Sequence, residues 1–438
     1  MLRIDIRDFR CFQHLTLDFK PGVNLLIGDN ASGKTSLLMA CKYALSSFFA
    51  GFSDENTKWE SPKSNDFRIV QANEETLLNE LPISITFSLN ELFEGASGTY
   101  TIEKNSKKNS HPLIRGIADY RDASALLQSS YYSKIVSGMD GHYAFNKALP
   151  LFVSFTTEDI HTVRKISGEQ FMNYSQKPSF GYYECMNCNG LLKYWIKRLL
   201  VLAEAGQGQT EINVVKRAIV KALGKEGCNI ISDMTIRPNR KKVFYRFMDG
   251  RESELDLLSD GYKRLVNIVT DIAFRCSLLN KEIYGDASAD QTKGVVLIDE
   301  IDMHLHPMLQ ARVLKGLKAA FPNLQFIVTT HAPMVMTGVM TDDCNAVHKI
   351  SYQNGMYTTE AVNTYGLDAS QILRLVLGVS PRDMEVDNRL KVLFDNIDDN
   401  KEKEARLELE ALENKFHDSL PELAQARAML DFNIIDND

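Results

Sequence analysis

The alternation of apolar and polar residues predicts antiparallel strands in the first part of the chain. Apolar residues occupy every second position in two runs, 2–6 and 15–19, which is typical of a hairpin with one buried face. The apolar run 23–28 ends in a glycine and leads into a segment, 34–45, whose apolar residues fall at helical spacing. The same patterns predict further strands at 81–89 and 98–105.

Helices and buried strands follow in the second half. Amphipathic segments predict helices at 191–205 and 210–223 and a long helix that begins at 260. Two apolar runs, 294–300 and 324–331, predict buried strands, and a helix is expected between them. A strand, a helix and a strand in this order imply a parallel sheet. The helix between them is expected at 307–321, other strands at 149–155, 230–236 and 242–250, and helical and looped structure at 110–148.

These elements predict an α/β protein with a mixed central sheet, antiparallel N-terminal strands, a helical insertion and a helical C-terminal tail. The head is expected at 1–364, with the insertion at about 105–225, and the tail at 365–438 is expected to serve assembly or partner docking. Helical patterns in the tail lie at 369–379, 388–397, 402–416 and 422–430. The helix at 402–416 has an apolar side suited to docking on a partner or to packing on the head, formed by Leu407, Leu409, Leu412 and Phe416.

Composition narrows the class of protein. The 438 residues are 44% hydrophobic, which is enough for a large core. A net charge of −7 argues against a protein that coats nucleic acid. The seven cysteines form no disulfide pattern, which favours the cytoplasm, and no apolar run reaches the roughly 18–20 residues that cross a membrane.

The segment GDNASGKTS fits a phosphate-binding loop, G-x-x-x-x-G-K-[ST], from Gly28 to Thr35. A predicted strand precedes it and a predicted helix follows it, which is the context that such a loop requires. Lys34 is expected to reach the β- and γ-phosphates of ATP, and Thr35 to bind Mg²⁺. Other phosphate contacts are expected from Asn30, Ser32, Gly33 and Ser36.

Two carboxylates end the buried strand in VVLIDE. Their burial would be costly without a cation and a water, so Asp299 is expected to bind Mg²⁺ and Glu300 to act as the base that orients the attacking water. His331 ends the strand in FIVTTH, where it can donate a hydrogen bond to the γ-phosphate.

The stretch LSDGYKRL begins a helix with no local ligand. The Ser259 hydroxyl and the Gly261 N–H could bind an anion at this helix start. The order of the elements separates this helix from the phosphate loop within one subunit, so a second subunit would have to bring the two together. The alternative is that Ser259 simply caps its own helix.

Along the chain the four motifs follow one another as phosphate loop, LSDG signature, strand ending in Asp299 and Glu300, and strand ending in His331. This order resembles that of ABC-type ATPase heads, in which two heads enclose ATP and each signature meets the γ-phosphate on the other head. The segments IRDFRCFQHLTLDF, IDEIDMHLHPMLQ and FPNLQFIVTTHAPMVM are similar to the SMC and RecF branch, which includes ATPases of bacterial antiphage systems. This resemblance implies that Arg10 approaches the nucleotide. It also implies that 304–307 forms a turn that crosses to the partner head.

Departures from that branch narrow the resemblance. Long heptad arms are absent between the motifs, and the tail offers no TOPRIM pattern, so no nuclease domain is expected in this chain. The chain most resembles the ATPase subunit of Septu-type systems, which implies a separate HNH endonuclease, higher oligomers and DNA contact through the complex. The ATPase of PARIS-type systems, whose partner is a TOPRIM protein, is a close competitor. A RecF-like repair or recombination ATPase that binds DNA itself is the alternative function.

Two further patterns carry weaker expectations. Cys185 and Cys188 lack a second pair at zinc-site spacing, so a thiol pair is favoured over a zinc site. A basic cluster could touch a DNA backbone or form an ordinary solvated strand face: Arg237, Arg240, Lys241, Lys242 and Arg246.

Overall fold

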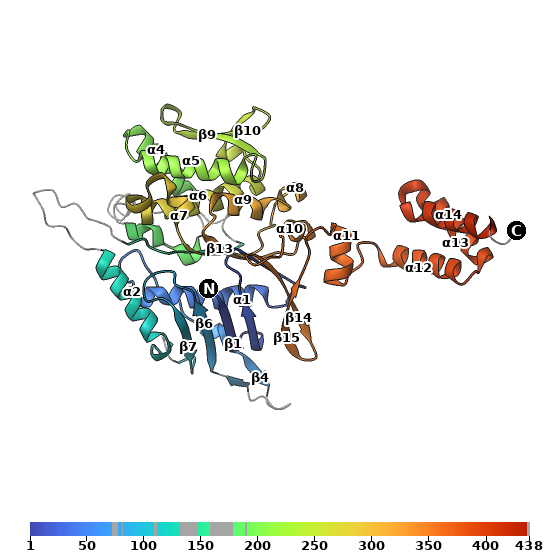
Figure 1. Ribbon diagram of the computed structural model, residues 1–438, viewed down its shortest axis with the longest axis horizontal. Coiled ribbons are helices and arrows are strands. Elements are labelled where there is room, and N and C mark those ends of the chain that lie inside the picture. Colours follow the sequence, from blue (N-terminus) through green and yellow to red (C-terminus); the bar gives the residue numbers. More distant parts are fainter. Residues whose placement is uncertain are drawn as a thin grey trace, which may run out of the picture. The chain divides into compact units, whose positions relative to one another are not determined.

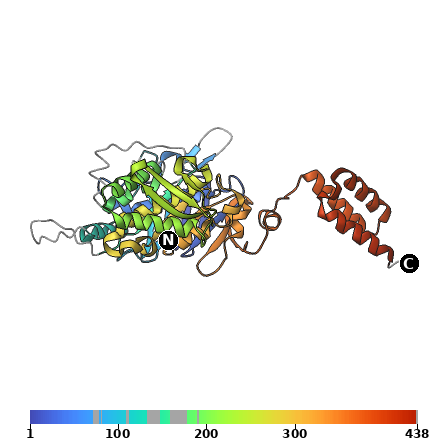
Figure 2. The same ribbon diagram turned by 90° about the horizontal axis from the view of Figure 1, so that it is seen from above.

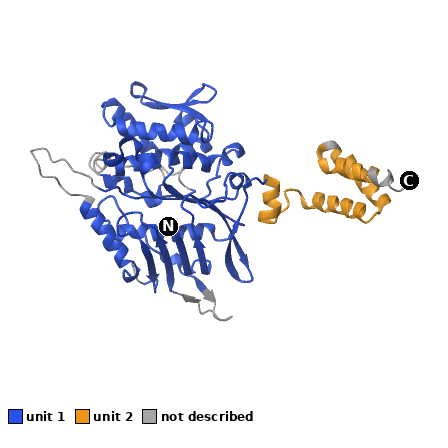
Figure 3. Cartoon of the chain, viewed as in Figure 1, with its two compact units in different colours: residues 1–367 blue, residues 368–438 orange. Residues whose placement is uncertain are grey.

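The contacts within the chain define two compact units, Met1–Leu367 and Asp368–Asp438, which Figure 3 shows in separate colours. The computed structural model describes residues 1–71, 78–80, 82–108, 112–131, 147–157, 178–188 and 191–435.

A six-stranded sheet forms the centre of the first unit, in the order β15-β14-β3-β13-β12-β8. Neighbouring strands are parallel except for β14 and β15, so the predicted mixed sheet is confirmed. The strands β3, β8, β12 and β13 are buried along their whole length, as strands covered on both faces must be. Their bounds are β3 Val23–Ile27, β8 Leu151–Phe155, β12 Gly294–Ile298, β13 Leu324–Thr329, β14 Ala346–Gln353 and β15 Met356–Val362.

The N-terminal strands form a second, antiparallel sheet in the order β2-β1-β6-β7, which confirms that prediction. Helix α1, Lys34–Ser46, contacts strands of both sheets and is buried along most of its length (Figure 1). The two sheets therefore hold the start of α1 in place. The strands of this sheet are β1 Arg3–Phe9, β2 Phe12–Asp18, β6 Ile83–Leu89 and β7 Gly98–Lys104, and a separate two-stranded sheet consists of β4 Ile69–Gln71 and β5 Leu78–Glu80.

Helices and a small sheet complete the unit. The long helix α6, Asp260–Tyr284, packs on α5 and contacts β8 of the central sheet. The three-stranded sheet β11-β10-β9 lies on α4 and α5, as Figures 1 and 2 show. Strand β8 belongs to the central sheet, so the segment predicted as an insertion contains a strand of the head. The bounds are α2 Ala118–Tyr131, α4 Leu192–Glu204, α5 Gln209–Leu223, β9 Ile231–Arg237, β10 Lys242–Phe247, β11 Glu252–Glu254, α7 Ser288–Gln291 and α10 Pro333–Thr337.

The continuous helix predicted at 307–321 is wrong. The structure has two helices there, α8 (Pro307–Gln310) and α9 (Val313–Ala320). The carbonyl oxygen of Ala311, at the break, would lie 2.4 Å from a Cβ on Gly338. This close approach to a distant segment fixes the backbone where the helix is interrupted, and the sequence pattern of 307–321 carries no sign of it.

The hairpin of β14 and β15 was not predicted, although a local signal for it exists. Asn354 and Gly355 connect the two strands, with φ values of 52° and 81°. Asn-Gly with both residues at positive φ is the favoured two-residue turn of a β-hairpin. This hairpin places β14 beside β3, the strand that leads into the phosphate loop.

The second unit is a bundle of the helices α12, Met384–Asp398, α13, Glu402–Phe416, and α14, Pro421–Ile435. It is preceded by α11, Ala369–Gln371, and a π-helix at Ile372–Leu377. Leu407 is 68% exposed, whereas Leu409 and Leu412 are buried in the core of this bundle. The core consists of Leu390, Leu393, Ile397, Ala405, Leu409, Leu412, Leu423, Ala426 and Leu430. Within the described residues of both units, no helix combines the length and the apolar character needed to cross a bilayer.

Candidate functional site

The loop between β3 and α1 is shaped by two glycines. Gly28 and Gly33 have φ values of 144° and 92°, which L side chains rarely adopt. A Cβ on Gly28 would lie 2.2 Å from the carbonyl oxygen of Ile350, and one on Gly33 would lie 2.6 Å from Cζ of Phe12. The loop is thus held between β14 and the turn that joins β1 to β2, and any larger residue at either glycine would displace it.

Lys34 turns back over this loop. Its Nζ donates hydrogen bonds to the carbonyl oxygens of Gly28 and Asp29, both at 2.8 Å, and to Oγ of Ser32 at 3.3 Å. Burial lowers the pKa of Lys34 to about 8, against the opposing effect of nearby carboxylates. Phosphate oxygens can replace these acceptors, since they are stronger partners for an ammonium group. Asn30 is exposed, Ser36 is half-buried and Ser32 is buried beneath the loop.

Asp299 lies beside the first turn of α1. Thr35 Oγ1 donates a hydrogen bond to Asp299 Oδ2 at 3.2 Å, and Thr329 Oγ1 donates one to Oδ1 at 2.6 Å. Mg²⁺ prefers oxygen ligands and takes most of them from water and phosphate, so one hydroxyl and one carboxylate from the protein fit it. Among the described residues, no cluster of three or more His, Cys, Asp or Glu forms a separate metal cage.

Glu300 has a constrained backbone. Its φ of 47° lies in a region that costs a non-glycine residue about 1 kcal/mol or more. Its N–H donates to Oγ1 of Thr329 at 2.8 Å, and its carbonyl oxygen accepts from the guanidinium of Arg264. The peptide groups on both sides of this residue are therefore held, which fixes the direction in which its carboxylate leaves the chain.

His331 lies at the same edge of the sheet. Strands β12 and β13 are parallel, with Ile298 opposite Val328, so the residues that follow both strands share one end of the sheet. His331 is half-buried there, and the preceding Thr330 donates to Oδ1 of Asp302 at 2.5 Å. The structure thus brings the predicted metal ligand, base and histidine to one edge of the sheet.

The signature residues lie at the start of α6. Ser259 is the N-cap of this helix, and its Oγ accepts from the N–H of Tyr262 at 3.5 Å, a long contact. A Cβ on Gly261 would lie 2.3 Å from the carbonyl oxygen of His304, so this glycine is required for close packing within the same chain. No hydrogen bond in the described part of the chain joins residues 258–261 to the phosphate loop.

Arg10 is anchored beside the loop. Its φ is 51°, its N–H donates to the carbonyl oxygen of Asp66 at 2.8 Å, and its Nε donates to Oδ1 of Asp66 at 2.7 Å. Asp66 is buried and also accepts from the hydroxyl of Tyr43. Arg10 therefore has a fixed position, with part of its guanidinium committed to a carboxylate.

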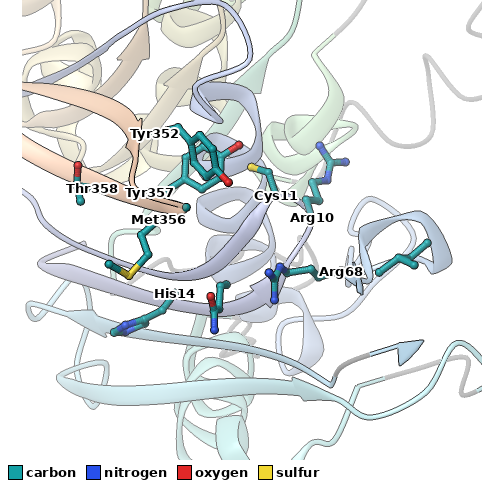
Figure 4. Close-up of a pocket in the computed structure, with 11 residues that line it drawn as sticks. Arg10, Cys11, His14, Arg68, Tyr352, Met356, Tyr357 and Thr358 are labelled. Carbon is teal, nitrogen blue, oxygen red and sulfur yellow. The ribbon is translucent and has the colours of Figure 1, made fainter. Parts of the chain in front are cut away.

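A pocket of about 620 Å³ opens next to Arg10 (Figure 4). Tyr352 and Tyr357 lie on one side of it, with ring centroids 4.7 Å apart, and Arg68 lies on the other side. Cys11 lines the pocket and also touches the phosphate loop, since its Sγ would lie 3.1 Å from a Cβ on Gly33. The pocket thus adjoins the loop through the turn between β1 and β2.

The residues at the end of β8 had no predicted role. The N–H of Asp299 donates to the carbonyl oxygen of Phe155 at 3.0 Å, which places Thr156 and Thr157 at the same sheet edge. Together with Thr35, these residues line a cavity of about 310 Å³ beside Asp299. The parallel alignment of three strand ends was the signal that could have identified them.

The structure also shows the surroundings of the cysteine pair and of the basic cluster. Cys185 and Cys188 are buried, and the Cys188 thiol donates to the carbonyl oxygen of Cys185 at 3.0 Å, so they are a packed thiol pair. In the basic cluster, Arg237, Lys242 and Arg246 form ion pairs with carboxylates of β11. These pairs neutralise part of the positive surface that a DNA backbone would require.

We expect Thr329→Val to weaken Mg²⁺ binding, because it removes a hydroxyl that serves both Asp299 and Glu300. The Mg²⁺ concentration for half-maximal ATP hydrolysis should rise about 10- to 100-fold, as for other partners of metal ligands. The unfolding free energy should fall by about 1–3 kcal/mol. Thr329→Ser, which keeps the hydroxyl, is the control. An unchanged Mg²⁺ requirement in the valine variant would contradict this role.

The chain matches a family model described as "AAA domain, putative AbiEii toxin, Type IV TA system" over residues 23–337. This segment contains the phosphate loop, the signature, Asp299, Glu300 and His331. It covers most of the first unit.

Named relatives match parts of the chain. The "Retron Vc95 probable ATPase" of Vibrio cholerae serotype O1 biovar El Tor is 36% identical over 128 residues, which are 29% of this chain and 24% of that protein. The "Septu protein PtuA" of Bacillus mycoides (strain KBAB4) is 32% identical over 133 residues, which are 30% of this chain and 18% of that protein. The chain thus spans about a quarter or less of these two proteins. The "Retron Ec83 probable ATPase" of Escherichia coli is 24% identical over 391 residues, covering 76% of this chain and 68% of that protein.

Among solved structures, the SMC head domain from Thermotoga maritima aligns with a TM-score of 0.41 and 16% identity, covering 82% of this chain and 98% of that chain. The resemblance to Septu ATPases that was drawn from the motifs is confirmed by the relatives. The retron ATPases were not anticipated.

Proposed function

Since the chain belongs to the family described as "AAA domain, putative AbiEii toxin, Type IV TA system", we propose that it hydrolyses ATP with Mg²⁺ between two paired heads. The observation that carries this proposal is the meeting of Lys34, Thr35, Asp299 and Glu300 around one loop and one sheet edge. Phosphoryl transfer depends mostly on positioning and charge stabilisation, and this arrangement provides both.

Each residue would perform one step on the bound ATP. Lys34 would exchange the loop carbonyls for oxygens of the β- and γ-phosphates. Glu300 would accept a hydrogen bond from the attacking water and align its oxygen with the γ-phosphorus. His331 would donate a hydrogen bond to a γ-phosphate oxygen. Thr35 and Asp299 would hold Mg²⁺, which when bound would supply positive charge that offsets the charge on the phosphates.

The nucleoside would extend from the loop toward the pocket beside Arg10. This pocket adjoins Gly33 through Cys11 and offers the exposed ring of Tyr352, which is 61% accessible. Aromatic faces of this kind stack on bases, and a fixed guanidinium can face ribose or phosphate oxygens. The proposed contact of Arg10 with the nucleotide is therefore one between its guanidinium and oxygens of the ribose or phosphates.

A second copy of the chain would complete the site. Ser259 and Gly261 lie at the start of α6. In the described part of the chain, no hydrogen bond joins them to the phosphate loop. A helix start favours an anion, and the γ-phosphate on another head is the anion that the family resemblance implies. Head pairing is therefore part of the proposed mechanism, and the second unit, 368–438, would extend it to higher oligomers.

The proposed cellular role is that of an ATPase subunit in a cytoplasmic antiphage defence complex. Similarity to a Septu protein and to retron ATPases supports this role. The similarity to Septu proteins supports a separate nuclease partner, of HNH type, whose access to DNA the paired heads would regulate.

Co-expression of this chain with an HNH-type endonuclease, if one is encoded beside its gene, tests the cellular role. The expected result is a stable complex that elutes as one species, whose cleavage of phage DNA changes when ATP is added. The Lys34→Ala variant, which loses the ammonium that faces the phosphates, should bind the same nuclease without responding to ATP. A chain that neither binds the nuclease nor alters its activity would contradict this role.

A DNA repair or recombination ATPase that binds DNA itself remains the second candidate. The basic cluster along β9, β10 and the turn between them favours it, although ion pairs engage three of its five cations. This function predicts tight binding of the chain alone to DNA junctions, dependent on ATP and falling steeply with salt. Weak, ATP-independent binding would exclude it.

A further inference from the structure

A buried arginine joins the signature helix to the loop that carries the base. Arg264 in α6 is 0% exposed. Its guanidinium donates to the carbonyl oxygens of Asp299 at 2.9 Å, of Glu300, and of Met303 at 3.4 Å. A planar guanidinium donates from several nitrogens in directions fixed by its plane, whereas a lysine ammonium donates from one freely rotating nitrogen. One side chain thus organises the backbone that follows β12.

The same two segments meet at a second point. Gly261 lies three residues before Arg264 on the same face of the helix, and it packs against the carbonyl oxygen of His304. A Cβ added to Gly261 would also come within 3.5 Å of Leu305 Cα. The first turns of α6 therefore contact both ends of the segment 299–305. A displacement of the helix start would displace this segment as well.

Glu300 lies at the centre of this contact. Its φ of 47° is maintained from one side by Thr329, which accepts from its N–H, and from the other by Arg264, which donates to its carbonyl oxygen. Strained backbone persists only where its surroundings hold it. Arg264 is thus one of two side chains that keep the carboxylate of Glu300 in its direction.

We propose that Arg264 is a positioning residue. It couples the binding of a γ-phosphate at Ser259 and Gly261 to the position of Glu300 in the same chain. Its guanidinium donates to backbone carbonyl oxygens of the segment that bears Asp299 and Glu300, and none of these hydrogen bonds goes to a carboxylate of the site or to the phosphate loop. When Ser259 and Gly261 of one copy engage the γ-phosphate on a second copy, the start of α6 moves with that phosphate. Arg264 transmits this movement to Glu300 in the first copy, so each nucleotide tunes hydrolysis of the other. The coupling rests on the proposed head pairing, whereas the positioning of Glu300 does not.

The first test separates positioning from general stability. Arg264→Lys keeps the positive charge but loses the planar guanidinium that donates to three carbonyl oxygens. The kcat for ATP hydrolysis should therefore fall about 10- to 100-fold, as for other residues that orient a catalytic group. The Kd for ATP should stay unchanged, because the phosphate loop is not touched. Arg275→Lys is the matched control, since Arg275 is equally buried in the same helix but binds Asp271 and the carbonyls of Gly181 and Tyr183.

The control should lower the unfolding temperature and leave kcat per folded molecule unchanged. If Arg264→Lys behaves like the control, or if kcat and ATP affinity fall together, Arg264 has only a structural role and the proposal is wrong.

The second test asks which chain Arg264 serves. Mixing a Lys34→Ala chain with a Ser259→Arg chain leaves one working site, which uses the loop and Glu300 of the Ser259→Arg chain. Adding Arg264→Lys to that chain should lower the activity of the mixture, and adding it to the Lys34→Ala chain should not. A loss that follows the Lys34→Ala chain would show that Arg264 acts on the other head, contrary to the proposal.

Suppose that the mixture of Lys34→Ala and Ser259→Arg chains is inactive although Arg264 is intact. If diluting wild type with a chain that carries both substitutions also halves the activity, the sites are not shared between chains and head pairing is wrong. Signature coupling then fails with it. The kcat and Kd of the single variant still decide whether Arg264 positions Glu300.

Discussion

Glu300→Gln is expected to reduce the rate of ATP hydrolysis by about 10²–10⁴-fold while ATP remains bound. The substitution keeps the size and the backbone contacts of residue 300, so the φ of 47° and the hydrogen bonds to Thr329 and Arg264 should persist. It removes only the negative charge that aligns the attacking water. Single-turnover hydrolysis of radiolabelled ATP and equilibrium binding of ATP measure the two quantities separately.

This variant should also trap paired heads. Heads held together by unhydrolysed ATP dissociate slowly, so Glu300→Gln with ATP and Mg²⁺ should sediment as a larger species than the same chain without nucleotide. Glu360→Gln, on exposed β15, is the control and should behave like the wild type. Turnover at the wild-type rate in the Glu300→Gln variant would remove Glu300 from the role of base.

The second large effect concerns sites shared between chains. Lys34→Ala and Ser259→Arg should each abolish hydrolysis alone, the first by removing the phosphate contact and the second by filling the helix start with a bulky cation. In a 1:1 mixture, about half of the dimers are mixed and each has one intact site, so about a quarter of the wild-type sites should return. Steady-state ATPase activity after equilibration measures the return.

A chain that carries both substitutions provides the control for this mixing experiment. Diluting wild type 1:1 with it should leave about a quarter of the activity if sites are shared, and about half if each chain hydrolyses alone. An inactive mixture together with a fall to a quarter means that both sites must act together. An inactive mixture together with a fall to half contradicts the trans site.

Many local features of the site could be predicted from the sequence because their chemistry depends on residues close together in the chain. The glycines at 28 and 33 shape one turn, and Lys34 and Thr35 begin the helix that follows it. Alternation identified the antiparallel sheet, and continuous apolar runs identified β3, β12 and β13. The positions of Asp299, Glu300 and His331 followed from the ends of those strands. The turn at Asn354 and Gly355 was equally local, and its hairpin could have been predicted.

The residues that the sequence missed depend on distant segments. Thr329 joins the site because β13 lies beside β12, and Arg264 joins it because α6 packs over the loop after β12. The interruption between α8 and α9 lies where Ala311 packs closely on Gly338. The phosphate loop at Gly33 packs closely on the ring of Phe12. Spacing along one segment carries no record of such partners.

The sequence by itself determined which residues have the chemistry for nucleotide binding and hydrolysis, since loop, strand end and helix start are each set by a few neighbouring residues. Only the tertiary structure decided how those groups are held. Strand order and helix packing bring Thr329 and Arg264 to opposite sides of the Glu300 peptide, and close contact between Gly261 and His304 ties the signature to the same loop. Such contacts arise from the packing of whole elements, which is why the sequence predicted no partner for the signature within its own chain, whereas the structure packs it against the loop that carries Glu300.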